Sequence, residues 1–193
     1  NIYVTGQEGT NGGDMFLRKY DSAGNLQWMQ TYNSGGTQQD LGHDIAVGPG
    51  NNIYVTGQEG TNGGDMFLRK YDSAGNFQWM QTYGFGGVND IGNGVAVGPG
   101  NNIYVTGEQE TNGKDMFLRK YDSAGNFQWM QTYNSGASQW DYGWGVAVGS
   151  DNNIYVAGWH VPGGAEMFLS KYDSAGNFQW IQSYSFASPQ WAY

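Results

Sequence analysis

The sequence contains no cysteine in its 193 residues, which excludes disulfide bonds and thiolate metal sites. Lys and Arg number only 8 against 17 Asp and Glu, so the formal net charge is −9. A chain of this sign repels phosphate backbones at long range, and we expect no nucleic-acid partner. It also lacks any basic amphipathic segment and any apolar run near the ~20 residues of a spanning helix, so we expect no membrane insertion.

Glycine and aromatic residues are abundant instead. The chain has 33 Gly but only 4 Pro, and 16% of its residues are aromatic. Glycine favours turns, whereas aromatic and β-branched side chains favour pleated, packed strands. This composition indicates an all-β fold of many short strands, and its aromatic content argues against disorder.

The chain repeats itself four times. The ten residues 19–28 (KYDSAGNLQW) return at 70–79, 120–129 and 171–180, with Phe in place of Leu26. An Asn-Ile-Tyr-Val marker places Ile2, Ile53, Ile103 and Ile154 at intervals of 51, 50 and 51 residues (53−2, 103−53 and 154−103). A period of about fifty residues with several strands per unit is typical of β-propeller blades.

Each unit predicts four strands, which in the first are residues 1–6, 14–20, 26–32 and 43–48. The short turns 21–25 and 48–51 make their flanking strands antiparallel neighbours. The Gly-rich link 33–42 is the longest, and in a propeller the longest link usually carries the chain from the outer edge of one blade to the inner edge of the next. The strand 43–48 is therefore expected innermost and 26–32 outermost.

The sequence thus predicts one all-β propeller array over 1–193, with four antiparallel strands in each of four blades. The units run approximately over 1–42, 43–92, 93–143 and 144–193. Because the chain starts on the second strand of a blade, it supplies fifteen strands (4×4−1), and one inner strand is missing from it. An unpaired sheet edge favours pairing, and three partners are open: flanking sequence outside this chain, a neighbouring copy of the chain, or loops that cover the edge. Of these we expect a homo-oligomer, closed into a ring or open as a filament.

Four recurring motifs lead to a family. They are Asn-Ile-Tyr-Val-Thr-Gly, Asp-Met-Phe-Leu-Arg-Lys-Tyr-Asp, Gly-Asn-Phe-Gln-Trp, and Asp-x-Gly followed by Val-Ala-Val-Gly. In this pattern the chain resembles the SBBP repeats, the seven-bladed β-propeller repeats of bacterial surface and secreted proteins. The resemblance spans essentially the whole chain in four units and implies an extracellular or cell-surface location. It implies no shared activity and carries over no catalytic motif.

The turn 21–25 (Asp-Ser-Ala-Gly-Asn) recurs in every unit. Its carboxylate and amide oxygens are ligands that Ca²⁺ prefers. A hairpin turn needs the same residues, because Asp bonds its own backbone and Gly or Asn tolerates positive φ. The later acidic ligands of an EF-hand are missing, so we expect turn chemistry and no cofactor, with Ca²⁺ as the alternative.

Residues that break the repeat are the candidates for a specific site. Aromatic residues replace Gln39, Leu41 and His43 in the third long link, and a Trp-His pair replaces Gln7-Glu8 in the fourth unit. In a propeller these two connections open on the same rim, so the residues are expected to converge near the last blade. The candidate rim consists of Trp140, Asp141, Tyr142, Trp144, Trp159 and His160.

Two roles fit this rim. Aromatic faces stack on the CH groups of a sugar ring while the oxygens of Asp141 and Gln139 bind its hydroxyls, which predicts a glycan partner. Trp and Tyr are equally enriched where one protein packs on another, which predicts an interface. The recurrent Trp28, Trp79, Trp129 and Trp180 are expected to pack between blades.

Catalysis has little support in the sequence. His43 and His160 are its two histidines, and neither has a metal-ligand spacing. Asp40, Asp90 and Asp141 recur in the same link, which is typical of a structural turn. We therefore expect no enzyme but a non-catalytic extracellular propeller, a structural or interaction module that self-assembles through its incomplete blade edge. The alternative is a carbohydrate-binding, lectin-like propeller that uses the Trp-rich rim.

Overall fold

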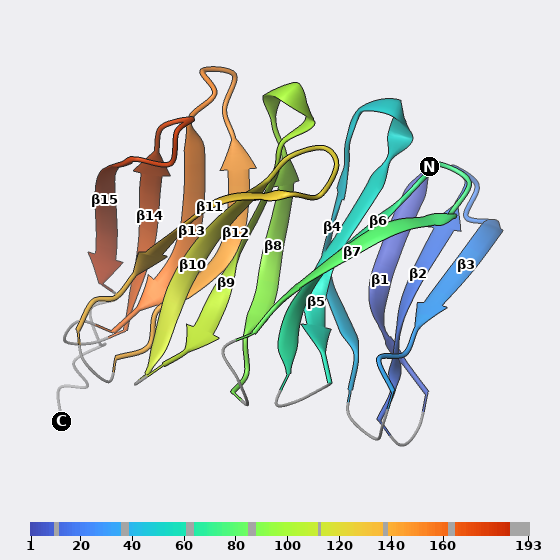
Figure 1. Cartoon of the computed structure of the whole chain (residues 1–193), viewed down its shortest axis with the longest axis horizontal. Helices are drawn as coiled ribbons and strands as arrows, with labels where there is room; N and C mark the ends of the chain where they lie inside the picture. The colour runs from blue at the N-terminus through green and yellow to red at the C-terminus, as the bar shows by residue number, and fades with distance from the viewer. Residues whose placement is uncertain are drawn as a thin grey trace, which may run out of the picture.

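The computed structural model of the chain describes residues 1–9, 12–35, 39–60, 64–84, 88–111, 113–136, 139–161 and 165–185. These residues form fifteen β-strands and two short 3₁₀ helices, Pro49–Asn51 and Pro99–Asn101. The strands build four antiparallel sheets that stand side by side like blades (Figure 1). The predicted four-bladed all-β array with one incomplete blade is therefore confirmed, and its sheets form an open row. Within this described part, no helix has the length and apolar character needed to cross a membrane.

The first sheet has three strands in the order β1-β2-β3, and each of the others has four. The first two sheets contain β1 (Ile2–Glu8), β2 (Asp14–Tyr20), β3 (Leu26–Tyr32), β4 (Leu41–Val47), β5 (Ile53–Glu59), β6 (Asp65–Tyr71) and β7 (Phe77–Tyr83). The last two contain β8 (Ile91–Val97), β9 (Ile103–Glu110), β10 (Lys114–Tyr121), β11 (Phe127–Tyr133), β12 (Tyr142–Val148), β13 (Ile154–His160), β14 (Glu166–Tyr172) and β15 (Phe178–Ser185).

Two strand boundaries differ from the sequence prediction by two residues, and the others agree to within one. β1 continues to Glu8 instead of ending at residue 6, because Glu8 still pairs with Asp14 across the hairpin. β4 begins at Leu41 instead of His43, because Leu41 and Gly42 pair with β5 ahead of a β-bulge. The rim is therefore built on paired strands and not on a free loop.

The hairpin turn between β2 and β3 shows why the Asp-Ser-Ala-Gly-Asn stretch recurs. The Asp21 carboxylate oxygen Oδ1 accepts hydrogen bonds from the backbone N–H groups of Ala23 and Asn25, each at 2.9 Å. Gly24 has φ of 86°, a conformation that costs glycine little. The same bonds recur in the other three sheets, so this turn fixes the outer hairpin of every blade.

The apolar core lies between the sheets rather than within one of them. Met15 and Leu17 of β2 pack against Ile53 and Val55 of β5, and all four side chains are fully buried. Equivalent clusters join the second sheet to the third and the third to the fourth. The two inner sheets bury both faces in this way, which explains why several strands are apolar on both sides.

Polar and aromatic contacts reinforce each boundary between sheets at the outer edge. Trp79 lies against Gly125 in the hairpin turn of the following sheet, as the repeat predicted. Beside it, the Lys70 ammonium donates a hydrogen bond of 3.3 Å to the Ser123 carbonyl of the same turn. The equivalents are Trp28 on Gly75, Trp129 on Gly176, Lys19 to Ser73 (3.0 Å) and Lys120 to Ser174 (3.5 Å).

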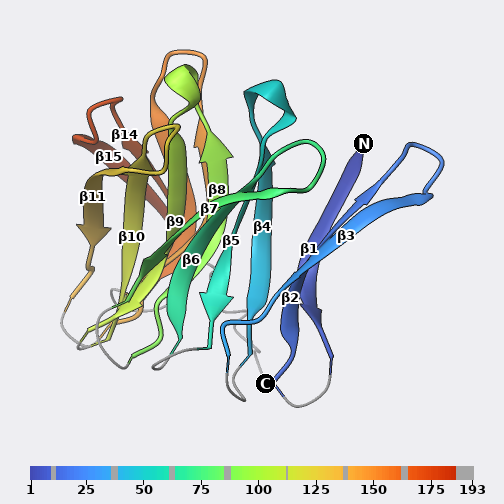
Figure 2. The same cartoon turned by 45° about the vertical axis from the view of Figure 1, so that its right-hand side comes forward.

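The row of sheets does not close on itself. The β1–β3 sheet and the β12–β15 sheet stand at opposite ends of the row in Figure 1, and in Figure 2 the last sheet lies behind the third, away from the first. Met167 and Leu169 on the outward face of the last sheet are 51% and 41% exposed. Ile2 and Val4 on the outward face of the first sheet are 50% and 41% exposed. Each end thus exposes apolar side chains whose counterparts are buried inside the row.

Candidate functional site

An aromatic hollow of about 620 Å³ opens on the outward face of the last sheet. Its walls come from the link before β12 and from the adjacent strands β12, β13 and β14. The principal lining side chains are Trp140, Tyr142, Trp144, Trp159 and Met167, whereas the Phe168 ring is buried between the third and fourth sheets. The structure thus brings together four of the six residues predicted for the rim.

Tyr142 occupies the centre of this aromatic group. Its ring stacks on Trp144 with 5.8 Å between centroids and 18° between planes. Trp159 lies 5.4 Å away at 35°, and Trp140 stands edge-on at 6.5 Å and 86°. Tyr142 and Trp159 are direct partners in the β12–β13 register, which fixes their separation. The wall of the hollow is therefore formed by aromatic rings that pack on one another and are held in place by strand pairing.

A β-bulge sets the position of Trp144. Gly143 pairs with Gly158 and Gly145 with Ala157, so Trp144 is the extra residue between them. A bulge re-aims the side chain that it carries. Trp144 is exposed as a result and forms one side of the hollow.

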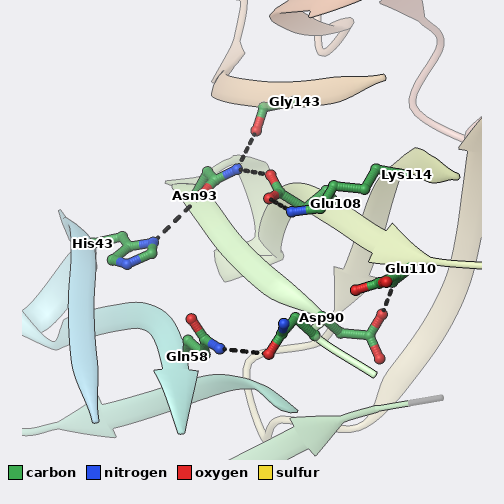
Figure 3. Close-up of polar contacts among 9 residues, drawn as sticks. His43, Gln58, Asp90, Asn93, Glu108, Glu110, Lys114 and Gly143 are labelled. Atoms are coloured by element: carbon green, nitrogen blue, oxygen red, sulfur yellow. Dashed lines mark hydrogen bonds and ion pairs between the residues drawn. The ribbon is translucent and has the colours of Figure 1, made fainter. Parts of the chain in front are cut away.

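The same bulge carries His43 and Asn93 in the two preceding sheets, and these side chains begin a polar chain that runs from β4 through β8 to β9, β10 and β12 (Figure 3). His43 Nδ1 lies 3.3 Å from Asn93 Oδ1. The Asn93 amide donates to Glu108 at 2.8 Å and to the Gly143 carbonyl at 3.1 Å. Lys114 Nζ then pairs with Glu108 Oε1 at 3.0 Å. The same β-bulge thus places polar side chains that bridge neighbouring sheets in the second and third sheets, and an aromatic side chain at the hollow in the last sheet.

Tyr142 lines the hollow and Lys114 lies beside its ring, and both groups keep their protons at neutral pH. Lys114 Nζ lies 5.4 Å from the centre of the Tyr142 ring. Burial lowers the pKa of Lys114, but the hydrogen bond and negative charge of Glu108 outweigh it, and the pKa is raised. Burial also raises the pKa of Tyr142, which the Lys114 charge offsets in part. Both groups are therefore available as hydrogen-bond donors at neutral pH.

Asp141 does not join the hollow, although sequence reasoning placed it there. Its side chain is fully buried, and Oδ2 accepts a 2.8 Å hydrogen bond from the Ser135 N–H in the preceding link. Asp40 has the same role in the first link, where it accepts bonds from Ser34 N–H at 2.8 Å and Gly60 N–H at 3.0 Å. The aspartate of the long link therefore organises the loop, and its carboxylate does not reach a ligand in the hollow.

His160 also lies elsewhere, because it follows Trp159 in a strand and neighbouring side chains point to opposite faces. It is buried between the third and fourth sheets, with Nδ1 at 3.1 Å from the Tyr133 hydroxyl and Nε2 at 2.9 Å from Ser183 Oγ. Glu166 Oε2 lies 3.4 Å from Nε2. The imidazole is therefore part of the packing between sheets.

The recurrent Asp turn gives calcium little to bind. Asp21 Oδ1 accepts two backbone N–H groups, and Oδ2 accepts the Asn25 amide at 3.0 Å, so both carboxylate oxygens serve the turn itself. Across the described ranges, no group of three or more His, Cys, Asp or Glu side chains is placed to hold a metal ion.

No protein-family model and no curated protein matches the chain. Solved structures do. A protein of unknown function from Bacteroides caccae aligns with a TM-score of 0.58 at 11% identity, covering 96% of this chain and 57% of that one. An ulvan lyase from a new family of polysaccharide lyases, bound to -[GlcA(1-4)Rha3S]-, aligns with a TM-score of 0.55 at 10% identity, covering 97% and 52%.

These likenesses show the class of fold. The chain is similar in fold to both proteins but spans little more than half the length of either. The resemblance to SBBP repeats stays a prediction from the sequence.

Sequence reasoning missed Met167, which lines the hollow, and the Lys114–Glu108 pair, whose ammonium lies beside the Tyr142 ring. Met167 repeats in every unit, so a search for residues that break the repeat passes over it. Lys114 and Glu108 do break it, since Gly13 and Gln7 hold these positions in the first unit. This pair of opposite charges was the available signal.

Proposed function

We propose that this chain is a non-catalytic interaction module of the cell exterior that self-associates through its two uncovered end sheets. The observation behind this proposal is the contrast between inner and end sheets. Met66 and Leu68 are fully buried, whereas the equivalent Met167 and Leu169 are about half exposed. Burying apolar surface is favourable by roughly 25 cal/mol per Å², so covering these faces favours association.

The incomplete blade supports the same function. Among the residues that the structure describes, the first sheet stops at β1 on its inner side, where the other sheets continue to β4, β8 and β12. A sheet edge presents a row of backbone donors and acceptors, and an incoming strand satisfies them by β-augmentation. The mechanism is therefore stacking of blade faces, with strand pairing at the open inner edge.

Light scattering across a dilution series tests self-association. We expect the mean mass to rise from one copy at low micromolar concentration to two or more copies near millimolar concentration. A mass of one copy throughout the series would remove the proposal.

The proposed lack of catalysis is supported by the lining of the hollow, which among the described residues includes no carboxylate, imidazole or amine side chain that could act as a base. A polysaccharide lyase removes a proton from its substrate, so it needs such a base. Incubation with ulvan tests this, because a lyase leaves an unsaturated sugar that absorbs ultraviolet light. A rate of absorbance increase that rises with the concentration of the chain would show that the chain is an enzyme.

Carbohydrate binding at the aromatic hollow is a second candidate function. Stacked Tyr142 and Trp144 offer the flat faces that pack on sugar rings, and the Gln139 side chain borders an adjoining hollow of about 350 Å³. One structural neighbour, the ulvan lyase, is bound to an oligosaccharide. The net charge of −9 disfavours anionic glycans, so the candidate ligand is a neutral oligosaccharide.

An array of neutral and acidic glycans, followed by titration of the best neutral hit, tests this function. Trp144→Ala and Trp159→Ala should each weaken binding, because each removes one face of the hollow. Phe178→Ala is the matched control, since Phe178 is exposed on the same sheet and does not line the hollow. Absence of binding at millimolar sugar, or equal binding by all variants, would eliminate the candidate.

A further inference from the structure

At each of the three internal boundaries, a tryptophan of one sheet packs on a turn glycine of the next. At the ends of the described row, the tryptophan of the last sheet has no turn glycine of a following sheet, and the turn glycine of the first sheet has no tryptophan of a preceding sheet. A Cβ built on the turn glycine would lie within 3 Å of the preceding sheet's indole at all three boundaries. Trp180 occupies the tryptophan position on the last sheet, where no further sheet follows within the described chain. Gly24 occupies the glycine position on the first sheet, where a Cβ would meet nothing within 4 Å.

The lysine–carbonyl hydrogen bond is divided in the same way. Each internal lysine, such as Lys70, donates to a serine carbonyl in the next hairpin turn. Lys171 has this position on the last sheet, and its ammonium instead lies 3.9 Å from Asp151 of its own sheet. The corresponding carbonyl is that of Ser22, in the open turn that contains Gly24.

A third pair joins arginine to tyrosine across the boundaries. The Arg69 guanidinium lies 3.9 Å above the centre of the Tyr32 ring, and Arg119 lies 3.8 Å above Tyr83. The last sheet has Ser170 at the arginine position, but the first sheet keeps Arg18. Arg18 pairs with Glu8 of its own sheet and is one-third exposed. The first sheet therefore has an arginine, Arg18, at the position that contacts a tyrosine of the preceding sheet at the internal boundaries.

The apolar faces complete the match. Inside the row, the Met-Leu face of one sheet packs on the Ile-Val face of the next. The last sheet exposes the Met-Leu face as Met167 and Leu169, and the first exposes the Ile-Val face as Ile2 and Val4. The two ends therefore carry complementary surfaces rather than identical ones.

We infer that the occupant of the last sheet's outward face is the first sheet of a second copy, in the register of the internal boundaries. Trp180 of one copy covers Gly24 of the next, and Lys171 donates to the Ser22 carbonyl. This inference rests on the proposed self-association and adds its surface and register. The contact is head to tail, so each pair leaves one face of either kind open, and growth ends in a ring or continues as a filament.

The aromatic hollow remains partly accessible in such a pair. Inside the row, β4 lies beside β8 and β8 lies beside β12 at the inner edge. The β1–β3 sheet has no strand at that place, so a second copy leaves the inner margin of the hollow, with Trp144, uncovered. Self-association and glycan binding are therefore compatible on one face.

Cross-linking tests the register, because the chain has no cysteine of its own. Ser22→Cys and Lys171→Cys are made in separate chains, mixed, and treated with a short bismaleimide. We expect linked dimers from the mixture and none from either variant alone. Lys70→Cys with Ser123→Cys in one chain calibrates the reaction across an internal boundary, where the wild-type Lys70 ammonium lies 3.3 Å from the Ser123 carbonyl. Failure of the mixture while the calibration succeeds would overturn the register, as would equal yields from single variants.

Trp180→Ala gives a second readout. It should weaken association at least tenfold, whereas Phe178→Ala should leave it within twofold, because Phe178 lies at a position that is exposed in all four sheets. A chain that stays monomeric contradicts the proposed self-association itself. A chain that associates with the same affinity in both variants contradicts only the head-to-tail register.

Discussion

The indole of Trp79 covers Gly125 so closely that a Cβ at Gly125 would lie 2.9 Å from the ring carbon Cδ2. Gly24 has nearly the same backbone, with φ of 86° against 90°, but nothing within 4 Å of its Cβ direction. The two glycines therefore face the same conformational demand and differ in packing. Gly24 is therefore a control for substitutions at Gly125, because it has nearly the same backbone conformation without the indole contact.

Gly125→Ala should destabilise the chain more than Gly24→Ala. Both substitutions place an alanine at positive φ, which costs about 1–2 kcal/mol. Gly125→Ala also forces a methyl group against the indole, and such overpacking adds about 1–3 kcal/mol. Urea unfolding at low micromolar concentration, where copies stay apart, measures the difference. Equal losses in the two variants would show that the indole does not press on the turn.

Arg69→Lys should destabilise the boundary between the first two sheets. Arg69 is buried over the Tyr32 ring, and its Nε donates to the Tyr71 hydroxyl at 2.8 Å. Lysine lacks the planar fork needed for both contacts, so we expect a loss of about 1–2 kcal/mol. Arg18→Lys is the matched control, because Arg18 lies at the open end and should change stability by less than about 0.5 kcal/mol.

The repeat made most of this fold predictable. Only Leu26 departs from identity among the four copies of residues 19–28, so one reading of the outer hairpin applied to all four blades. Loop length then ordered the strands, because a short turn joins neighbours and the long link 33–42 cannot. The exact start of β4 was not predictable, since the pairing of Leu41 and Gly42 depends on a bulge that sequence alone does not reveal.

The candidate site was predictable only in part. Trp140, Tyr142, Trp144 and Trp159 stood out because they break the repeat, and the topology brings them to one rim. The sequence did not show directly that the Asp141 and His160 side chains point away from the hollow. Alternation along β13 sends His160 to the side opposite Trp159, and the repeat of Asp40 already indicated that Asp141 organises a loop. Both corrections follow from local geometry more than from residue type.

Asp40→Asn should cost more stability than Asp141→Asn. Asp40 accepts backbone N–H groups on both carboxylate oxygens, so an amide turns one acceptor into a donor that faces an N–H. Asp141 Oδ1 accepts no hydrogen bond from the residues that the structure describes, so an amide nitrogen there disturbs no existing bond. We expect about 1–3 kcal/mol for Asp40→Asn and less than half of that for Asp141→Asn in urea unfolding. The reverse order would contradict the assigned loop contacts.

Stability should fall in acid, and the turn aspartates are one cause. In the folded chain the pKa of Asp122 is lowered, first by the hydrogen bond from the Asn126 side chain and then by backbone N–H groups. The turns at Asp21, Asp72 and Asp173 show the same shift. A carboxyl with a lowered folded pKa stabilises the fold above its unfolded pKa, about 3.9, and loses that effect as pH falls through the folded value.

Asp122→Asn isolates this contribution. The variant should melt below the wild-type chain at pH 7, and the gap should narrow as pH falls below about 4, where the wild-type carboxyl also loses its charge. Asp65 acts in the opposite direction, because burial and the Glu59 charge raise its pKa, so the wild-type curve alone mixes both signs. The contribution of Asp65 cancels in the difference between the two melting temperatures, since Asp65 is present in both chains. A gap that stays constant from pH 7 to pH 2 would mean that the turn depends on the shape of the side chain and not on its charge.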